Sequence, residues 1–309
     1  MVPRRVVLDK ETLILLWQEL SRGWNVSPWR NPFSKETILT VLRTTKLFLR
    51  GKARLLEIEG PVAVVGNLHG NFQALYRIFN KFCVDLRTQS YINHQLLFLG
   101  DYVDRGSDGL RVVLFISIGL MLFPNFCPLR GDHEFFGTNS RYGFLEECQK
   151  LFPGQDGIDI HRAANEMFGD LPVACLISKK VLCMHGGLGK DLTNLNQIRK
   201  LPRDLQEPLQ GFAKDLFSAD TQPGLDVEKK CKQLKVDGFV RANFSSMSDV
   251  HLYAKGMTNT GVSTTNYENS QNTRSVMTIN EDLTYHYTFF KELNDNNDVV
   301  AGDPEEKMM

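Results

Sequence analysis

Four short apolar segments, each running into a polar segment that contains glycine, constrain the fold of this chain most strongly. They lie at 62–65, at 95–99, within FCPLRGDHE (126–134) and within KKVLCMHGGL (179–188). Helical spacing of apolar residues between them predicts helices over 71–82, up to about 122, over 138–150 and over 158–168. Buried strands that alternate with helices are typical of an α/β sheet covered on its faces. We therefore predict the α/β fold class, with functional residues at the carboxyl ends of the strands.

The remaining segments fit around this core. Residues 9–22 and 34–50 have helical spacing behind an acidic or Ser-initiated first turn. From about 236 the chain changes to short β-like segments, which predict a second, more antiparallel sheet. The absence of a linker predicts one domain over 1–292, with N-terminal helices at 9–50 and a catalytic core at 61–292. The acidic, turn-rich residues 293–309 predict a disordered tail.

Charge and cysteine usage exclude several classes of protein. Lys plus Arg and Asp plus Glu number 36 each, so the formal net charge is zero, which argues against a nucleic-acid partner. The most apolar stretch, 112–128, is too short to span a bilayer, and the N-terminus has no apolar segment of a signal peptide. The six cysteines form no CxxC pair, so we expect a reducing compartment, the cytoplasm or the nucleus.

The polar segments that follow the strands combine glycines with potential metal ligands. They read GNLHG (66–70), GDYVDRG (100–106), GDHE (131–134) and HGG (185–187). Glycines let the chain turn sharply and let a ligand approach the backbone. A mixture of imidazole with carboxylate or amide oxygen suits Mn, Fe or Zn. One such segment would be weak support, but four in order, each after an apolar strand, predict a metal site.

In this order the four segments resemble the GDxHG, GDxVDRG, GNHE and HGG motifs of the PPP family of serine/threonine phosphatases. RYGFLEEC (141–148), the segment from 171 to 188 and NLNQIRKL (194–201) resemble the protein phosphatase 1 branch of that family. The resemblance runs from about residue 9 to about residue 290. It implies a central β-sandwich flanked by helices, the metallophosphoesterase fold, with two divalent metals at the strand ends.

The resemblance also implies which residues hold the metals. Asp101 would bridge both of them. The other positions are His69 and Asn67 for the first metal, and Asp132, His185 and Asn243 for the second.

Three further residues receive catalytic roles from the resemblance. His133 would be the general acid that protonates the leaving alkoxide, Asp104 would hydrogen-bond to His133, and Arg105 would hold the phosphate. A serine alkoxide leaves poorly, and a positioned proton donor contributes roughly 10²–10⁴ in rate. His94 and His161 have polar neighbours in the sequence, so we predict that both lie at the surface.

The chain departs from the family pattern at the metal positions. Asn67 stands where the family has Asp, Asp132 where it has Asn, and Asn243 where it has His. An amide oxygen is a weaker ligand than carboxylate or imidazole, so we expect the first metal to bind loosely or to be lost. The extra charge of Asp132 should repel a phosphate. The segment that carries the family's second phosphate-binding arginine is also absent, and Arg241 is a poor replacement.

Two functions therefore stay open. The first is a metal-dependent phosphoprotein phosphatase, of full or weak activity, that acts by attack of a metal-bound hydroxide on the phosphate. The second is a pseudophosphatase that binds phosphoproteins or regulatory subunits without efficient turnover. A phosphodiesterase or nuclease on the same scaffold is disfavoured by the neutral charge and by the phosphatase resemblance.

Overall fold

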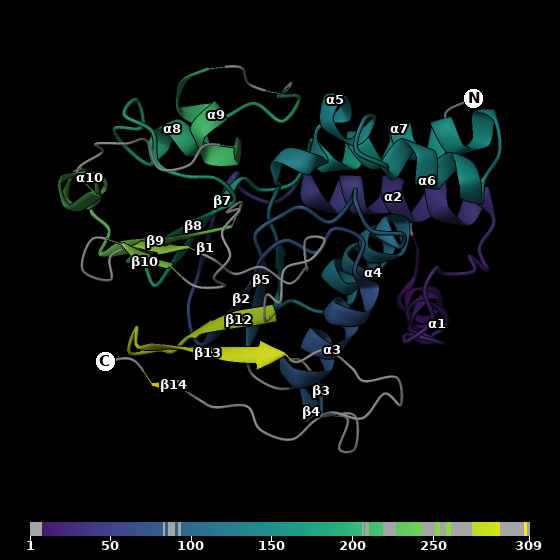
Figure 1. The fold of residues 1–309 in the computed structure, drawn as a ribbon, viewed down its shortest axis with the longest axis horizontal. Coiled ribbons are helices and arrows are strands. Elements are labelled where there is room, and N and C mark those ends of the chain that lie inside the picture. The colour runs from purple at the N-terminus through teal and green to yellow at the C-terminus, as the bar shows by residue number, and fades with distance from the viewer. Residues whose placement is uncertain are drawn as a thin grey trace.

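Two six-stranded sheets form the centre of the molecule (Figure 1). The computed structural model describes residues 8–82, 84–85, 90–91, 94–205, 207, 210–218, 227–242, 251–253, 258–260, 274–290 and 306–307. The first sheet has the order β14-β13-β12-β2-β5-β6, and the second has the order β1-β7-β8-β9-β11-β10. A two-stranded sheet joins β3 (Val84–Asp85) and β4 (Ser90–Tyr91).

The first sheet combines parallel and antiparallel pairs. Its strands are β2 (Val62–Val65), β5 (Gln95–Phe98), β6 (Phe126–Pro128), β12 (Arg274–Ile279), β13 (Tyr285–Phe290) and β14 (Glu306–Lys307). β2, β5 and β6 pair in parallel, whereas β12 runs antiparallel to both β2 and β13.

The second sheet is also mixed. It consists of β1 (Leu55–Ile58), β7 (Ala174–Ile177), β8 (Val181–Met184), β9 (Gly238–Arg241), β10 (His251–Tyr253) and β11 (Thr258–Thr260). β8 pairs antiparallel with β7 and parallel with β9.

Strand β2 is buried on both of its faces. Val62 and Val64 pack into a cluster that also contains Cys175 and Val240 of the second sheet, so this cluster fills the space between the sheets. Ala63 and Val65 point the other way, into the cluster formed with the helices, as the alternation of side chains along a strand requires. A strand buried on both faces has to be apolar throughout, and this explains the uninterrupted run VAVV.

Helices cover the outer faces of the sandwich. The helices α1 to α4, α6 and α7 pack into one core cluster with the first sheet, and those from α8 to α10 lie beside the second sheet (Figure 1). Their bounds are α1 (Lys10–Ser21), α2 (Lys35–Leu49), α3 (Phe72–Phe82), α4 (Gly109–Leu122), α5 (Phe136–Asn139), α6 (Phe144–Leu151), α7 (Gln155–Phe168), α8 (Asn196–Arg199), α9 (Gly211–Ser218) and α10 (Val227–Leu234). The side chains of Asp9 and Ser34 cap α1 and α2 by accepting hydrogen bonds from backbone N–H groups of the first turn. Among the described residues, no helix combines the length and the apolar character needed to cross a membrane.

The predicted fold class is confirmed, since two sheets flanked by helices form an α/β sandwich. The prediction of a separate C-terminal sheet is wrong. β12 and β13 extend the first sheet, and β9, β10 and β11 extend the second. Local alternation shows that a segment is a strand, but the choice of partner strand depends on contacts between residues distant in sequence. The single domain over 1–292 stays a prediction. The predicted disordered tail at 293–309 lies outside the described residues except for 306–307. These two residues form β14, which pairs with β13.

His161 is a second correction. It lies on α7 with 1% of its surface exposed, rather than at the surface as predicted. Its polar neighbours in the sequence occupy the other faces of the helix, while the residue itself points inward with Ile160, Ala164 and Phe168. His94 is partly exposed.

Candidate metal and phosphate site

The carboxyl ends of four strands meet around the side chain of Asp101. Three of these strands, β2, β5 and β6, belong to the first sheet, and β8 belongs to the second. Short loops after them carry the predicted residues, which are Asn67, His69, Asp101, Asp104, Arg105, Asp132, His133 and His185. The site therefore lies at one edge of the sandwich, between the two sheets.

The backbone of these loops is unusual. His69, Asp101, Asp104 and Arg105 all have positive φ, between 41° and 70°. This left-handed conformation costs a non-glycine residue about 1–2 kcal/mol, and such strain gathers at functional sites. The backbone N–H of His69 donates to the carbonyl oxygen of Asp101 at 2.8 Å, so the loops after β2 and β5 are bonded directly to each other.

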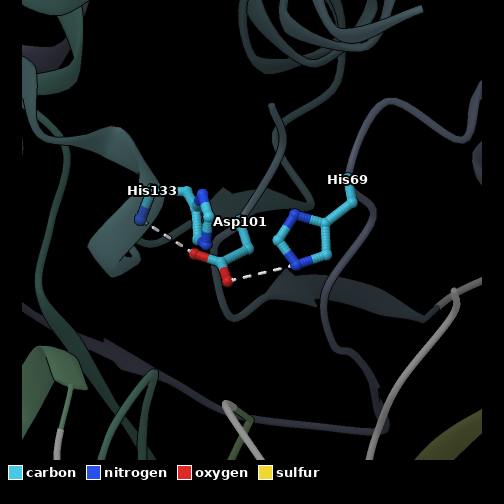
Figure 2. A group of neighbouring side chains, drawn as sticks. All are labelled: His69, Asp101 and His133. Atoms are coloured by element: carbon cyan, nitrogen blue, oxygen red, sulfur yellow. Dashed lines mark hydrogen bonds and ion pairs between the residues drawn. The ribbon is translucent and has the colours of Figure 1, made fainter. Parts of the chain in front are cut away.

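Asp101 is the centre of the site and is almost completely buried. Its Oδ2 lies 3.6 Å from Nε2 of His69, and its Oδ1 lies 3.3 Å from Nε2 of His185. Oδ1 also accepts a hydrogen bond from the backbone N–H of His133 at 3.1 Å (Figure 2). Burial opposes ionisation, but the neighbouring imidazoles, first that of His185, outweigh it and hold the pKa of Asp101 well below its usual range.

Two histidine rings are oriented by backbone carbonyl groups. His69 Nδ1 lies 3.0 Å from the carbonyl oxygen of Val103, and His185 Nδ1 lies 2.9 Å from that of Leu99. Donation from Nδ1 leaves Nε2 of each ring facing Asp101, which is the orientation of a metal-binding histidine. Burial, only partly offset by Asp101, lowers the pKa of His69 to about 4. Burial likewise disfavours the charged form of His185, but the carboxylates of Asp101 and Asp132 raise its pKa well above the usual value.

His133 is paired with Asp104. Its Nδ1 lies 2.6 Å from Oδ2 of Asp104, whose Oδ1 accepts a hydrogen bond from the backbone N–H of Phe144 at 2.9 Å. Burial opposes protonation of His133, but the hydrogen bond to Asp104 and the charges of Asp101 and Asp132 raise its pKa to about 9. These contacts favour the protonated ring, which can donate a proton.

Asp132 adds a carboxylate next to His185. Its Oδ1 lies 3.3 Å from His185 Nε2, and 26% of its side chain is exposed. Burial and the charge of Asp101 raise the pKa of Asp132, and His185 opposes this. Arg105 is exposed beside the site, and its backbone N–H donates to the carbonyl oxygen of Tyr142.

The side chains form two groups that could hold a metal. Asp101, Asp132 and His185 bring one ligand atom each to within 4.8 Å of one another, and His69, Asp101 and His133 do the same. The first of these groups fits a divalent cation well, because it offers two carboxylates and an oriented imidazole. The second is weaker, because it offers one carboxylate where the first offers two. Asn67, two residues before His69, is buried but offers only an amide as a ligand. Asn243 lies outside the described residues.

The sequence did not indicate two features that organise this site. Glu134, completely buried, accepts hydrogen bonds from the backbone N–H groups of Asp101, Tyr102 and Gly131, so it ties the loops after β5 and β6 together. Burial and the charge of Asp101 raise its pKa to about 7. Its place in GDHE was the only sequence signal for it. The second feature is a buried amide network that joins Asn139 to the backbone of His133.

Comparison with known proteins gives consistent matches. The family described as calcineurin-like phosphoesterase matches residues 60–243, more than half of the chain. A Caenorhabditis elegans protein named "Putative serine/threonine-protein phosphatase" is 33% identical in an alignment of 231 residues that covers 69% of this chain and 61% of that protein. The chain thus spans less than two thirds of this relative's length.

Solved structures share the fold. A Saccharomyces cerevisiae protein serine/threonine phosphatase, described as similar to human phosphatase PP5, superposes with a TM-score of 0.75 at 25% identity, covering 85% of this chain and 91% of the other. A cold-active protein-tyrosine phosphatase from a Shewanella species superposes with a TM-score of 0.59 over 78% of this chain and 82% of its own, and at 13% identity it is similar in fold alone.

Proposed function

This chain belongs to the calcineurin-like phosphoesterase family, and on that premise we propose that it hydrolyses phosphoserine and phosphothreonine esters of proteins. The observation that carries the proposal is the His133–Asp104 pair, in which the imidazole of His133 is hydrogen-bonded to a buried carboxylate and its backbone N–H to Asp101. Such a pair is useful for a poor leaving group, because a serine or threonine alkoxide has to be protonated as it departs.

Asp104, His133 and Arg105 have separate roles in this reaction. Asp104 holds Nδ1 of His133, so Nε2 is the atom that donates the proton to the leaving oxygen. Arg105, exposed at the rim, binds the phosphoryl oxygens through its guanidinium group. A divalent metal bound at this site would activate water and offset the charge of the phosphoryl group. Asp101, Asp132 and His185 would hold it best, with the amide of Asn243 as a fourth ligand.

We further propose that the two metal positions differ in affinity. Mn, Fe and Zn all suit the mixture of imidazole and carboxylate in the group of Asp101, Asp132 and His185. The position beside His69 has Asn67 as its extra ligand and is weaker. Weak occupancy there, together with the charge of Asp132 facing the substrate phosphate, predicts a slow enzyme.

The direct test is hydrolysis of a phosphoserine peptide by the purified protein with added Mn²⁺. We expect measurable turnover that falls by roughly 10²–10⁴ in His133→Ala. The variant Asp156→Asn, exposed on α7, serves as the control and should retain full activity. Wild-type turnover that survives in His133→Ala would exclude this mechanism.

The second candidate is a pseudophosphatase that binds phosphoproteins or regulatory subunits. It is favoured by one observation, that the carboxylate of Asp132 lies 3.3 Å from His185 and remains partly exposed. It predicts no turnover by the wild type, with turnover gained in the combined variant Asn67→Asp, Asp132→Asn and Asn243→His. Under both proposals we expect the protein to bind regulatory subunits and to be located in the cytoplasm or the nucleus.

A further inference from the structure

Asn139, the last residue of α5, is completely buried and uses both ends of its side-chain amide. Its Nδ2 donates to the carbonyl oxygen of His133 at 3.0 Å and to Oδ1 of Asn165 at 2.9 Å. Its Oδ1 accepts from Nε2 of His161 at 2.7 Å and from Nδ2 of Asn165 at 3.1 Å. A buried amide that makes all of these bonds is held in one orientation.

The partners on α7 decide which way the amide points. His161 and Asn165 lie one helical turn apart, so both reach Asn139 from the same face of the helix. Burial lowers the pKa of His161 to about 4, so its ring is neutral near pH 7 and has one N–H to donate from Nε2. If the amide of Asn139 were flipped, its oxygen would face the carbonyl oxygen of His133, and two acceptors would meet without a proton between them.

The bond from Asn139 completes the fixation of His133. The ring is held at Nδ1 by Asp104, the backbone N–H is held by Asp101, and the backbone carbonyl is held by Asn139. The first two contacts come from the loop after β5, whereas the third comes from α5. Loss of the third contact would let the peptide of His133 rotate while the ring remained tethered, and so would change the direction of Nε2.

We propose that Asn139, supported by His161, is a positioning residue that aims the proton donor His133 at the leaving group. The inference rests on the proposed phosphatase function. It predicts that substitutions of Asn139 and His161 change the rate of hydrolysis by an amount that depends on the leaving group. An alkoxide needs the proton from His133, whereas nitrophenolate departs without it. Misplacement of the donor should therefore slow the hydrolysis of phosphoserine far more than that of p-nitrophenyl phosphate.

The experiment compares Asn139→Asp with the wild type on both substrates. The substitution keeps the size of the side chain and removes the donor to His133. We expect kcat for a phosphoserine peptide to fall by ~10²-fold with little change in KM, because a shift of about 1 Å in a catalytic group has that effect. For p-nitrophenyl phosphate we expect a change below about threefold. Asn196→Asp, at an exposed position on α8, is the matched control.

A pair of substitutions at His161 tests the same idea if Asn139→Asp does not fold. His161→Gln retains an N–H that can reach Asn139, while His161→Leu fills the space without a donor. We expect the leaving-group-dependent loss in His161→Leu, at about tenfold, and its rescue in His161→Gln. Equal losses on both substrates in every variant would mean that the network supports only the fold, and would overturn the proposal.

A measurement without turnover separates this inference from the proposed function. The proton between His133 Nδ1 and Asp104 Oδ2 lies in a 2.6 Å hydrogen bond and should give a far-downfield proton resonance. We expect this resonance to shift or broaden in Asn139→Asp and in His161→Leu, and to be restored in His161→Gln. If the wild type hydrolyses neither substrate, the proposed function fails while the resonance still tests the positioning. An unchanged resonance in both variants would overturn the positioning role.

Discussion

Nδ1 of His133 lies 2.6 Å from Oδ2 of Asp104, and the other oxygen of the same carboxylate accepts the backbone N–H of Phe144. One side chain therefore connects the proton donor to the start of α6. Asp104 has no exposed surface, so the geometry of the pair is fixed by packing as well as by hydrogen bonding.

Replacement of Asp104 by Asn should keep the bond to Phe144 and remove the negative charge beside His133. We expect kcat for a phosphoserine peptide to fall by roughly 10²–10⁴, because the imidazole is then less often protonated and less well oriented. Steady-state kinetics at pH 7 with circular dichroism as a control for folding measures this. An intact protein with wild-type kcat would show that the pair has no catalytic role.

The two metal positions should be distinguishable by stoichiometry. We expect the wild type to bind about one equivalent of Mn²⁺ tightly, and Asn67→Asp to approach two, because a carboxylate is a stronger ligand than an amide. Isothermal titration calorimetry and elemental analysis of the dialysed protein measure this. His185→Ala should remove the tight site in both backgrounds. Two equivalent tight sites in the wild type would contradict the proposed asymmetry.

Stability should fall in acid partly because of His161. Its pKa is about 4 in the folded protein and about 6.5 when unfolded, so the unfolded state binds more protons as the pH falls below 6.5. The resulting loss at pH 4.5 is roughly 2–3 kcal/mol. Urea unfolding at pH 7 and pH 4.5 should show that His161→Gln loses less stability between these pH values than the wild type. An identical loss in both proteins would mean that His161 does not titrate in this way.

Substitution of Gly100 and of Gly60 compares a tightly packed glycine at the site with an unpacked one outside it. Both have positive φ, at 115° and 88°. A Cβ on Gly100 would collide with the backbone of Gly131, whereas nothing lies within 4 Å of one on Gly60.

Gly60→Ala should therefore cost only the left-handed strain, about 1 kcal/mol. Gly100→Ala should cost roughly 3–5 kcal/mol, because the loops after β5 and β6 must also separate. Chemical unfolding of both variants measures the difference. Comparable stability of the two would show that these loops yield easily.

Much of the site could be predicted because each residue follows an apolar strand directly. His69, Asp101 and His185 lie within a few residues of the ends of β2, β5 and β8, and burial of both strand faces makes such strands easy to recognise. The resemblance to the phosphatases then indicated which of these residues would share a metal. Glu134 was missed because its function is to accept three backbone N–H groups from two loops, and no spacing in the sequence shows this.

The fold class, the apolar strands and the order of the residues that follow them could be predicted from the amino-acid sequence, because these depend on local periodicity. The division of the four strands between two sheets, the extension of both sheets by C-terminal strands and the burial of His161 against Asn139 became visible only in the folded chain. All three have the same cause. Strand pairing and the burial of a polar ring depend on partners far away in the chain, and neither hydrophobic spacing nor residue type specifies those partners.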